Sequence, residues 1–176
     1  MADFYQTGII ATLHRLSPGG MERLEAELES FAGVLPIGLV LPALYSEFEN
    51  PSMQGIINEL AKVRYVKRIV LALGRASYVE YQHARSFFHN FPIPVTFLWI
   101  DTDNAQALFR TLEANGLSAG GDGKGRSCWL AYGYLLASQE CEVIALHDCD
   151  IVNYSRELLA RLCYPVANPN LGYEFC

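Results

Sequence analysis

The stretch Ile37-Gly38-Leu39-Val40-Leu41 decides the fold: it is a short run without a polar side chain that ends at Pro42. A run so short and so apolar is typical of a parallel strand that is buried on both faces of a sheet. Three further strand-like runs follow, at residues 68–73, 95–100 and 142–146. Helical patterns separate these runs, so the sequence predicts an α/β fold with a mainly parallel sheet and helices on both faces.

The segments between the runs show the 3.6-residue spacing of apolar side chains that marks amphipathic helices. Ser77 and Glu80 have the form of a capping box, and Asp103 is the expected cap of a later helix. The expected helices begin at Ser17-Pro18, Asn50-Pro51, Ser77, Asp103, Lys124 and about Tyr154, and end near residues 33, 63, 89, 115, 138 and 162. Residues 171–175 are expected to form a further strand.

The composition excludes several classes of protein. Of the 176 residues 51% are hydrophobic and 18% are charged, which argues against disorder and favours one folded domain. The net charge of −6 argues against binding nucleic acid through its phosphates. The longest apolar stretch, residues 33–45, is too short for a membrane span, and the N-terminus has no signal-peptide pattern. The five cysteines include no C-x-x-C pair, so reduced thiols in a cytoplasmic protein are expected and a zinc site is not.

Two acidic residues directly follow the fourth expected strand, in His147-Asp148-Cys149-Asp150. Ligands of parallel sheets bind beyond the carboxyl ends of the strands, which is where these carboxylates would lie. Hard carboxylate oxygens suit Mg²⁺ or Mn²⁺, ions that keep positions for water and for substrate phosphates. The alternative is equally open: Asp148 caps a turn, and Asp150 starts the next helix.

A glycine-rich segment, residues 120–126, is the second candidate for ligand binding. Its glycines let backbone N–H groups approach an anion at the start of the next helix, and Lys124 adds a positive charge. The segment is not a Walker A loop, because Gly125 follows the lysine where Ser or Thr is required. A glycine-rich surface loop is the alternative, but its combination with the downstream acids favours a diphosphate site.

The third candidate is the turn at residues 41–47, where a proline and a nearby acid can shape a pocket for a nucleobase and ribose. A plain β–α turn is the alternative reading. The exits of the second and third strands, residues 74–77 and Asp101, would line the same rim. His147 is a weaker candidate beside the acids, and core packing is favoured for Trp129, Tyr132 and Tyr134.

Together these motifs resemble the nucleotide-sugar glycosyltransferases of the GT-A fold, a Rossmann-like α/β fold. In that family the first strand ends in a Pro-Ala-x-x-Glu-like turn and the fourth in Asp-x-Asp. More narrowly, Gly123-Lys124-Gly125, a helix and Asp148-Cys149-Asp150 are similar to the glucosyl-3-phosphoglycerate synthase and mannosylglycerate synthase group. The resemblance covers about residues 36–151.

The resemblance implies roles for particular residues. Asp150 would be the metal ligand, and Asp148 would contact the ribose or a metal-bound water, so both are candidate catalytic residues. The substrate-binding residues would be Pro42, Ala43, Leu44, Glu47, Gly74, Arg75, Gly123 and Lys124. Two departures bear on this assignment. Tyr45-Ser46 stands where the group has Asn-Glu, so Glu47 is expected to be shifted by one position. The second strand does not end in the group's Asp-x-Gly-Ser-like run.

The implied function is transfer of a hexose from a UDP- or GDP-hexose to a small hydroxy acid such as 3-phosphoglycerate or glycerate, dependent on Mg²⁺ or Mn²⁺. The alternatives are a sugar nucleotidyltransferase and a non-catalytic nucleotide-binding or assembly module of the same fold. Residues 1–35 are expected to be an N-terminal helical extension. Residues 36–176 are expected to be the nucleotide-sugar-binding part of a domain that continues beyond the chain, and a homodimer is left open.

Overall fold

The structure is a computed structural model that describes residues 20–176. Its sheet has four parallel strands in the order β3-β2-β1-β4. The strands are β1 (Ile37–Leu44), β2 (Val66–Gly74), β3 (Val95–Trp99) and β4 (Val143–Leu146). The helices are α1 (Met21–Phe31), the 3₁₀ helix η1 (Tyr45–Glu49), α2 (Pro51–Leu60), α3 (Tyr78–Ser86), α4 (Asp103–Ala114), α5 (Lys124–Ser138) and α6 (Arg156–Ala167).

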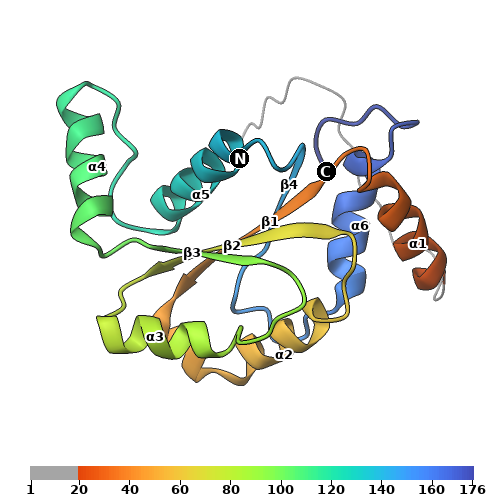
Figure 1. Cartoon of the computed structure of the whole chain (residues 1–176), viewed down its shortest axis with the longest axis horizontal. Coiled ribbons are helices and arrows are strands. Elements are labelled where there is room, and N and C mark those ends of the chain that lie inside the picture. Colours follow the sequence, from red (N-terminus) through yellow and green to blue (C-terminus); the bar gives the residue numbers. More distant parts are fainter. Residues whose placement is uncertain (1–19) are drawn as a thin grey trace, which may run out of the picture.

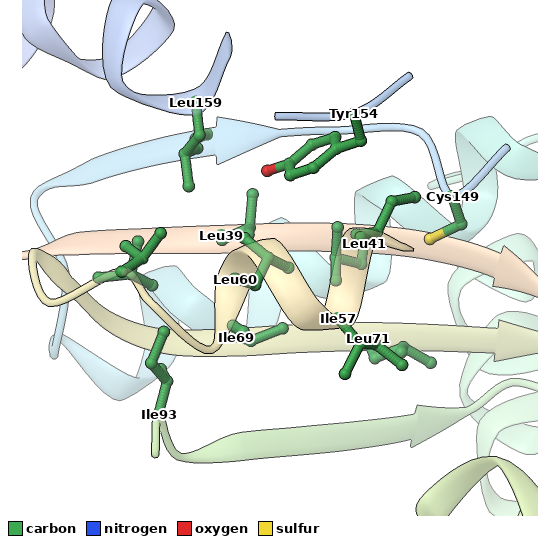
Figure 2. Close-up of a cluster of buried hydrophobic side chains, with 14 of the residues drawn as sticks. Leu39, Leu41, Ile57, Leu60, Ile69, Leu71, Ile93, Cys149, Tyr154 and Leu159 are labelled. Carbon is green, nitrogen blue, oxygen red and sulfur yellow. The ribbon is translucent and has the colours of Figure 1, made fainter. Parts of the chain in front are cut away.

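Helices cover both faces of the sheet (Figure 1), so the α/β fold predicted from the apolar runs is confirmed. Alternating side chains of β1 point to opposite faces: Leu39 and Leu41 belong to the core shared with α1, α2, α3 and α6, whereas Val40 belongs to the core shared with α4 and α5. Figure 2 shows the first of these two cores. Burying one such side chain completely contributes about 1.5–3 kcal/mol, so the two cores account for most of the stabilisation of the sheet.

A glycine in β1 lets α5 pack closely on the sheet. A Cβ atom at Gly38 would lie 3.1 Å from Leu135 of α5 and 3.1 Å from the Sγ atom of Cys141. This close approach fixes the position of α5 relative to β1. The first turn of α5 follows the glycine-rich segment, so the packing also positions that segment.

Pro42 does not end the first strand, contrary to the prediction, because β1 continues to Leu44. The backbone N–H of His147 donates to the carbonyl of Val40 at 3.1 Å, so Val40 bonds toward β4. Pro42, two residues on, has its nitrogen on the same side, but β4 has already ended at Leu146. The N–H that proline lacks is therefore not needed.

Other boundaries also differ from the predictions. Thr102 caps α4, since its side chain accepts a hydrogen bond from the N–H of Ala105 at 3.2 Å. The third predicted helix ends early, at Ser86, and α6 continues through Pro165 to Ala167. The prediction of a strand at residues 171–175 is wrong, because only Phe175 there is a bridge residue.

Two further predictions concern the start of the first helix and the absence of a membrane-spanning helix. The predicted helix start at Ser17-Pro18 lies outside the described residues, and α1 is seen from Met21. Within residues 20–176, none of the helices combines the length and the apolar character that a membrane span requires.

Candidate functional site

A cavity of about 210 Å³ lies at the carboxyl ends of β1 and β2, beneath the first turn of α5. Its lining residues are Pro42, Ala43, Leu44, Glu47, Arg75, Gly123, Lys124 and Ser127. Seven of these eight were singled out from the sequence as substrate-binding residues. The eighth predicted residue, Gly74, ends β2 directly before Arg75 and does not line the cavity. Larger hollows of about 510–530 Å³ lie elsewhere, along α3 and β3 and along β4 and α6, but away from these motifs.

The cavity exists because neighbouring strands have different lengths. Val40 of β1 pairs with Leu146, the last residue of β4, whereas β1 continues four residues further beside β2. The carboxyl end of β1 therefore lacks a neighbour on one side. The turn after β4 and the first turn of α5 border that gap, which places Lys124 next to the residues that follow β4.

Lys124 and Asp148 form an ion pair in which the ammonium donates a hydrogen bond to Oδ1 of the carboxylate. This bond raises the pKa of Lys124, and the charges of Asp148 and Asp150 raise it further. The two sequence motifs, 24 residues apart, therefore share one rim of the sheet. Asp150 is exposed on the same loop.

Glu47 brings a third carboxylate toward this rim. Its Oε2 atom accepts a hydrogen bond from the N–H of Leu44 at 3.2 Å. Burial raises the pKa of Glu47, and the negative charges of Asp150 and Asp148 raise it further. The predicted shift of Glu47 by one position has therefore not removed it from the cavity.

The acidic side chains of the rim fit a divalent ion that also binds a ligand. Within residues 20–176, no group of three or more His, Cys, Asp or Glu side chains is placed to hold a metal ion by itself. Mg²⁺ is commonly bound through one or two carboxylates together with substrate phosphates. The open rim at Asp148 and Asp150 has the oxygen donors for that arrangement, so these residues fit Mg²⁺ or Mn²⁺.

The exit of β2 is held by contacts from the end of β3 and from the turn that follows it. The N–H of Ala76 donates to Oδ2 of Asp101 at 2.9 Å, and Nε1 of Trp99 donates to the carbonyl of Ala76 at 2.9 Å. Arg75 has a φ of +53°, a left-handed conformation that is uncommon for a residue other than glycine. These contacts stabilise that conformation and place Arg75 at the edge of the cavity.

Sequence reasoning missed Ser127 and gave little weight to His147. Ser127 lies three residues after Lys124 on α5, and its hydroxyl donates to the carbonyl of Gly123 at 3.3 Å. Helical spacing from Lys124 is the signal that could have found it. His147 is buried, and burial lowers its pKa to about 4, so its imidazole is neutral.

Comparison with known proteins gives relatives for nearly the whole chain. No protein-family model matches it. The glucosyl-3-phosphoglycerate synthase of Persephonella marina is 48% identical over 175 residues, and that of Methanococcoides burtonii is 33% identical over 174 residues. These matches cover 99% and 98% of the chain but 43% and 42% of the relatives, so the chain spans less than half the length of the curated relatives that it matches.

Solved structures show the same fold. The glucosyl-3-phosphoglycerate synthase of Mycobacterium tuberculosis in complex with Mn²⁺, UDP-glucose and phosphoglyceric acid matches with a TM-score of 0.57 and 18% identity, over 91% of this chain and 48% of that one. Its complex with Mg²⁺ and UDP matches with a TM-score of 0.56 and 19% identity, over 90% and 47%. The resemblance expected from the sequence is thus confirmed: the chain is a homologue of the glucosyl-3-phosphoglycerate synthases and has the GT-A glycosyltransferase fold.

Proposed function

We propose that the whole protein transfers a hexose from a nucleoside-diphosphate hexose to 3-phosphoglycerate or a similar small hydroxy acid. The observation that carries the proposal is the ion pair of Lys124 with Asp148 at the mouth of the cavity. It holds an ammonium group against one of the two acidic residues of the rim, with Asp150 two residues further along the loop. A diphosphate requires a cation, and its metal ion requires carboxylates, so this place offers both. The names of the relatives support the hydroxy-acid acceptor, since both are glucosyl-3-phosphoglycerate synthases.

The donor's nucleoside would occupy the cavity. Pro42, Ala43 and Leu44 offer an apolar wall and backbone groups to a base, and Glu47 is an acceptor for ribose hydroxyls. Lys124 and Arg75 would face the diphosphate, because ammonium and guanidinium groups make charge-assisted hydrogen bonds to phosphate oxygens. The M. tuberculosis enzyme was solved with UDP and with UDP-glucose, which supports a pyrimidine donor.

Asp150, assisted by Asp148, would hold Mg²⁺ or Mn²⁺ beside the diphosphate. When bound, the ion offsets the negative charge that develops on the leaving nucleoside diphosphate. The carboxylates alone would repel the donor, so an ion between them and the phosphates is also a condition for binding. The homologous structures contain Mn²⁺ or Mg²⁺, which supports this choice of ion.

We also propose that residues 36–176 are the nucleotide-sugar-binding part of a larger catalytic unit. The curated relatives are more than twice as long as the stretch that matches. Helix α5 has no charged residue from Ser127 to Ser138, and Trp129 and Leu136 are exposed on it. A helix that is apolar all round is typical of a buried position, so this surface is suited to contact with another part of the protein. Helix α1, which precedes residue 36, packs on α6. The hydroxyl of Tyr164 in α6 donates a hydrogen bond to Glu27 in α1 at 2.5 Å.

Calorimetry with UDP and with GDP, each with and without Mn²⁺, tests the proposal. We expect binding of at least one nucleotide that strengthens with Mn²⁺, and hexosyl transfer to 3-phosphoglycerate or glycerate by the whole protein. Nucleotide binding that Mn²⁺ leaves unchanged would contradict the donor site. Metal-dependent binding without turnover of the whole protein would instead identify a non-catalytic nucleotide-binding module.

A further inference from the structure

Two buried polar side chains bracket the loop that carries Asp148 and Asp150. Nδ1 of His147 and the hydroxyl of Tyr154 are 3.0 Å apart and form a hydrogen bond. The two rings pack edge to face with their centroids 5.3 Å apart. His147 is 5% exposed and Tyr154 is 8% exposed. This bond, the His147–Tyr154 clamp, closes the loop across seven residues inside an apolar core.

The two ends of the loop are also attached to the rest of the fold. At the start, the N–H of His147 donates to the carbonyl of Val40 in β1 at 3.1 Å. At the end, the N–H of Arg156 donates to Oε2 of Glu59 at 3.2 Å, and its guanidinium lies 3.3 Å from Glu25. The clamp lies between these anchors and joins one to the other.

The middle of the loop turns its carboxylates outward. Cys149 is 1% exposed and points into the same core as Tyr154 (Figure 2). Asp148 and Asp150, on either side of Cys149, remain accessible at the rim. Fixing His147 and Cys149 in the core therefore fixes the directions of both acidic side chains.

Filling this part of the core with a histidine stabilises the fold less than an apolar side chain would. Nε2 of His147 is buried and makes no hydrogen bond among the described residues. Leaving a buried polar atom unpaired destabilises a fold, and an apolar side chain would fill the same space without that penalty. Apolar packing alone, however, would not define the orientation of the loop as a directional hydrogen bond does.

We infer that Tyr154 is a positioning residue, which acts through its hydrogen bond to His147 to hold Asp148 and Asp150 in the geometry that binds a metal–nucleotide complex. The inference rests on the proposed function for its ligand. The clamp itself is a property of the loop, so it can be tested without any ligand.

The test is the variant Tyr154→Phe, which keeps the ring and removes only the hydroxyl. The matched control is Tyr65→Phe: Tyr65 is 1% exposed in the same core, but its buried hydroxyl makes no hydrogen bond within residues 20–176. In Tyr154→Phe, amide hydrogen exchange of residues 148–153 should become about tenfold faster, because local opening of the loop is easier. Tyr65→Phe should leave that exchange within about twofold of the wild-type protein.

The second readout is the Mn²⁺ concentration that gives half-maximal binding of UDP or GDP. We expect it to rise about tenfold in Tyr154→Phe, as losses of supporting hydrogen bonds around a metal site do, and to stay unchanged in Tyr65→Phe. His147→Asn keeps a polar atom near the place of Nδ1 and should retain most of the wild-type exchange protection and Mn²⁺ requirement. His147→Leu should resemble Tyr154→Phe.

Equal exchange in Tyr154→Phe and Tyr65→Phe would overturn the clamp. Faster exchange without a change in the Mn²⁺ requirement would overturn the positioning role and leave a merely structural bond. If the wild-type protein binds neither nucleotide in a Mn²⁺-dependent way, the proposed function fails, and the exchange comparison still decides the clamp.

Discussion

Lys124 at the first turn of α5 and Asp148 after β4 form an ion pair across the mouth of the cavity. The ammonium serves as the counter-ion of an acidic rim that also includes Asp150 and, farther in, Glu47. A donor that arrives with its metal ion brings charges of both signs. The ammonium can then face phosphate while the metal ion faces the carboxylates, so the net charge of the rim changes little.

Lys124→Met should weaken binding of the nucleoside diphosphate by about 10- to 100-fold, because one charge-assisted hydrogen bond contributes about 1.5–3 kcal/mol. Calorimetry measures this loss. Lys62→Met is the control: Lys62 also pairs with an acid, Glu59, and its side chain is 55% exposed against 53% for Lys124. Equal weakening by both substitutions would mean that the effect comes from net charge and not from the site.

Asp150→Ala should slow hexosyl transfer by the whole protein about 10²-fold or more, because a single electrostatic element of this kind contributes about 3–4 kcal/mol to lowering the barrier. The Mn²⁺ dependence of nucleotide binding should disappear with it. Steady-state turnover at saturating donor measures the first effect and calorimetry the second. Glu113→Ala removes an exposed carboxylate of α4 and should change neither. Near-normal turnover of Asp150→Ala would refute the metal role.

The sheet could be predicted because each strand contains a short apolar run. Such a run can be recognised in the sequence before its neighbours in the sheet are known. The start of α5 at Lys124 follows in the same way from the glycines before it. The extension of β1 through Pro42 could not be predicted, since it depends on where β4 stops. The strand predicted at residues 171–175 does not form beyond the bridge residue Phe175, because a strand needs a partner as well as a pattern.

The rule that strand ends share one rim grouped residues 42–47, 74–77 and 147–150. The glycine-rich segment and the family resemblance added Gly123 and Lys124 to the expected lining of the cavity. Contacts across that rim could not be predicted. The left-handed φ of Arg75 depends on the hydrogen bonds that the next residue, Ala76, makes with Asp101 and Trp99 at the exit of another strand. The clamp between His147 and Tyr154 depends on the path of the loop between them, which no local pattern specifies.

Arg75→Asn should weaken binding of the nucleoside diphosphate several-fold, and it should reduce the dependence of binding on ionic strength, without lowering the melting temperature. Asn adopts the left-handed region more readily than Arg, so the substitution removes the charge without adding backbone strain. Gln139→Asn is the matched control, because Gln139 has a φ of +54° at the end of α5, away from the cavity. A fall in melting temperature for Arg75→Asn alone would show that the guanidinium stabilises the loop instead of binding ligand.

Glu47→Gln should raise the free energy of unfolding of the protein at neutral pH and weaken its binding of the nucleoside diphosphate. Burial raises the pKa of Glu47 above its ordinary value of 4.5, with Asp150 and Asp148 adding to the shift. As the pH rises past 4.5, the unfolded chain releases this proton while the folded chain keeps it, so the free energy of unfolding falls until the higher pKa is passed. The amide has no proton to lose, and its oxygen can still accept the hydrogen bond from the Leu44 N–H.

Urea unfolding between pH 4 and pH 8 measures this effect. The gain from Glu47→Gln should be absent near pH 4, where both states of the wild-type protein hold the proton, and should reach its full size above the raised pKa. Glu49→Gln removes an exposed carboxylate from the same 3₁₀ helix and is the control. A gain that is the same at every pH would assign the stabilisation to packing. A gain confined to neutral pH, together with weaker nucleotide binding, would show that this carboxylate is kept in the cavity for its ligand at the expense of the stability of the fold.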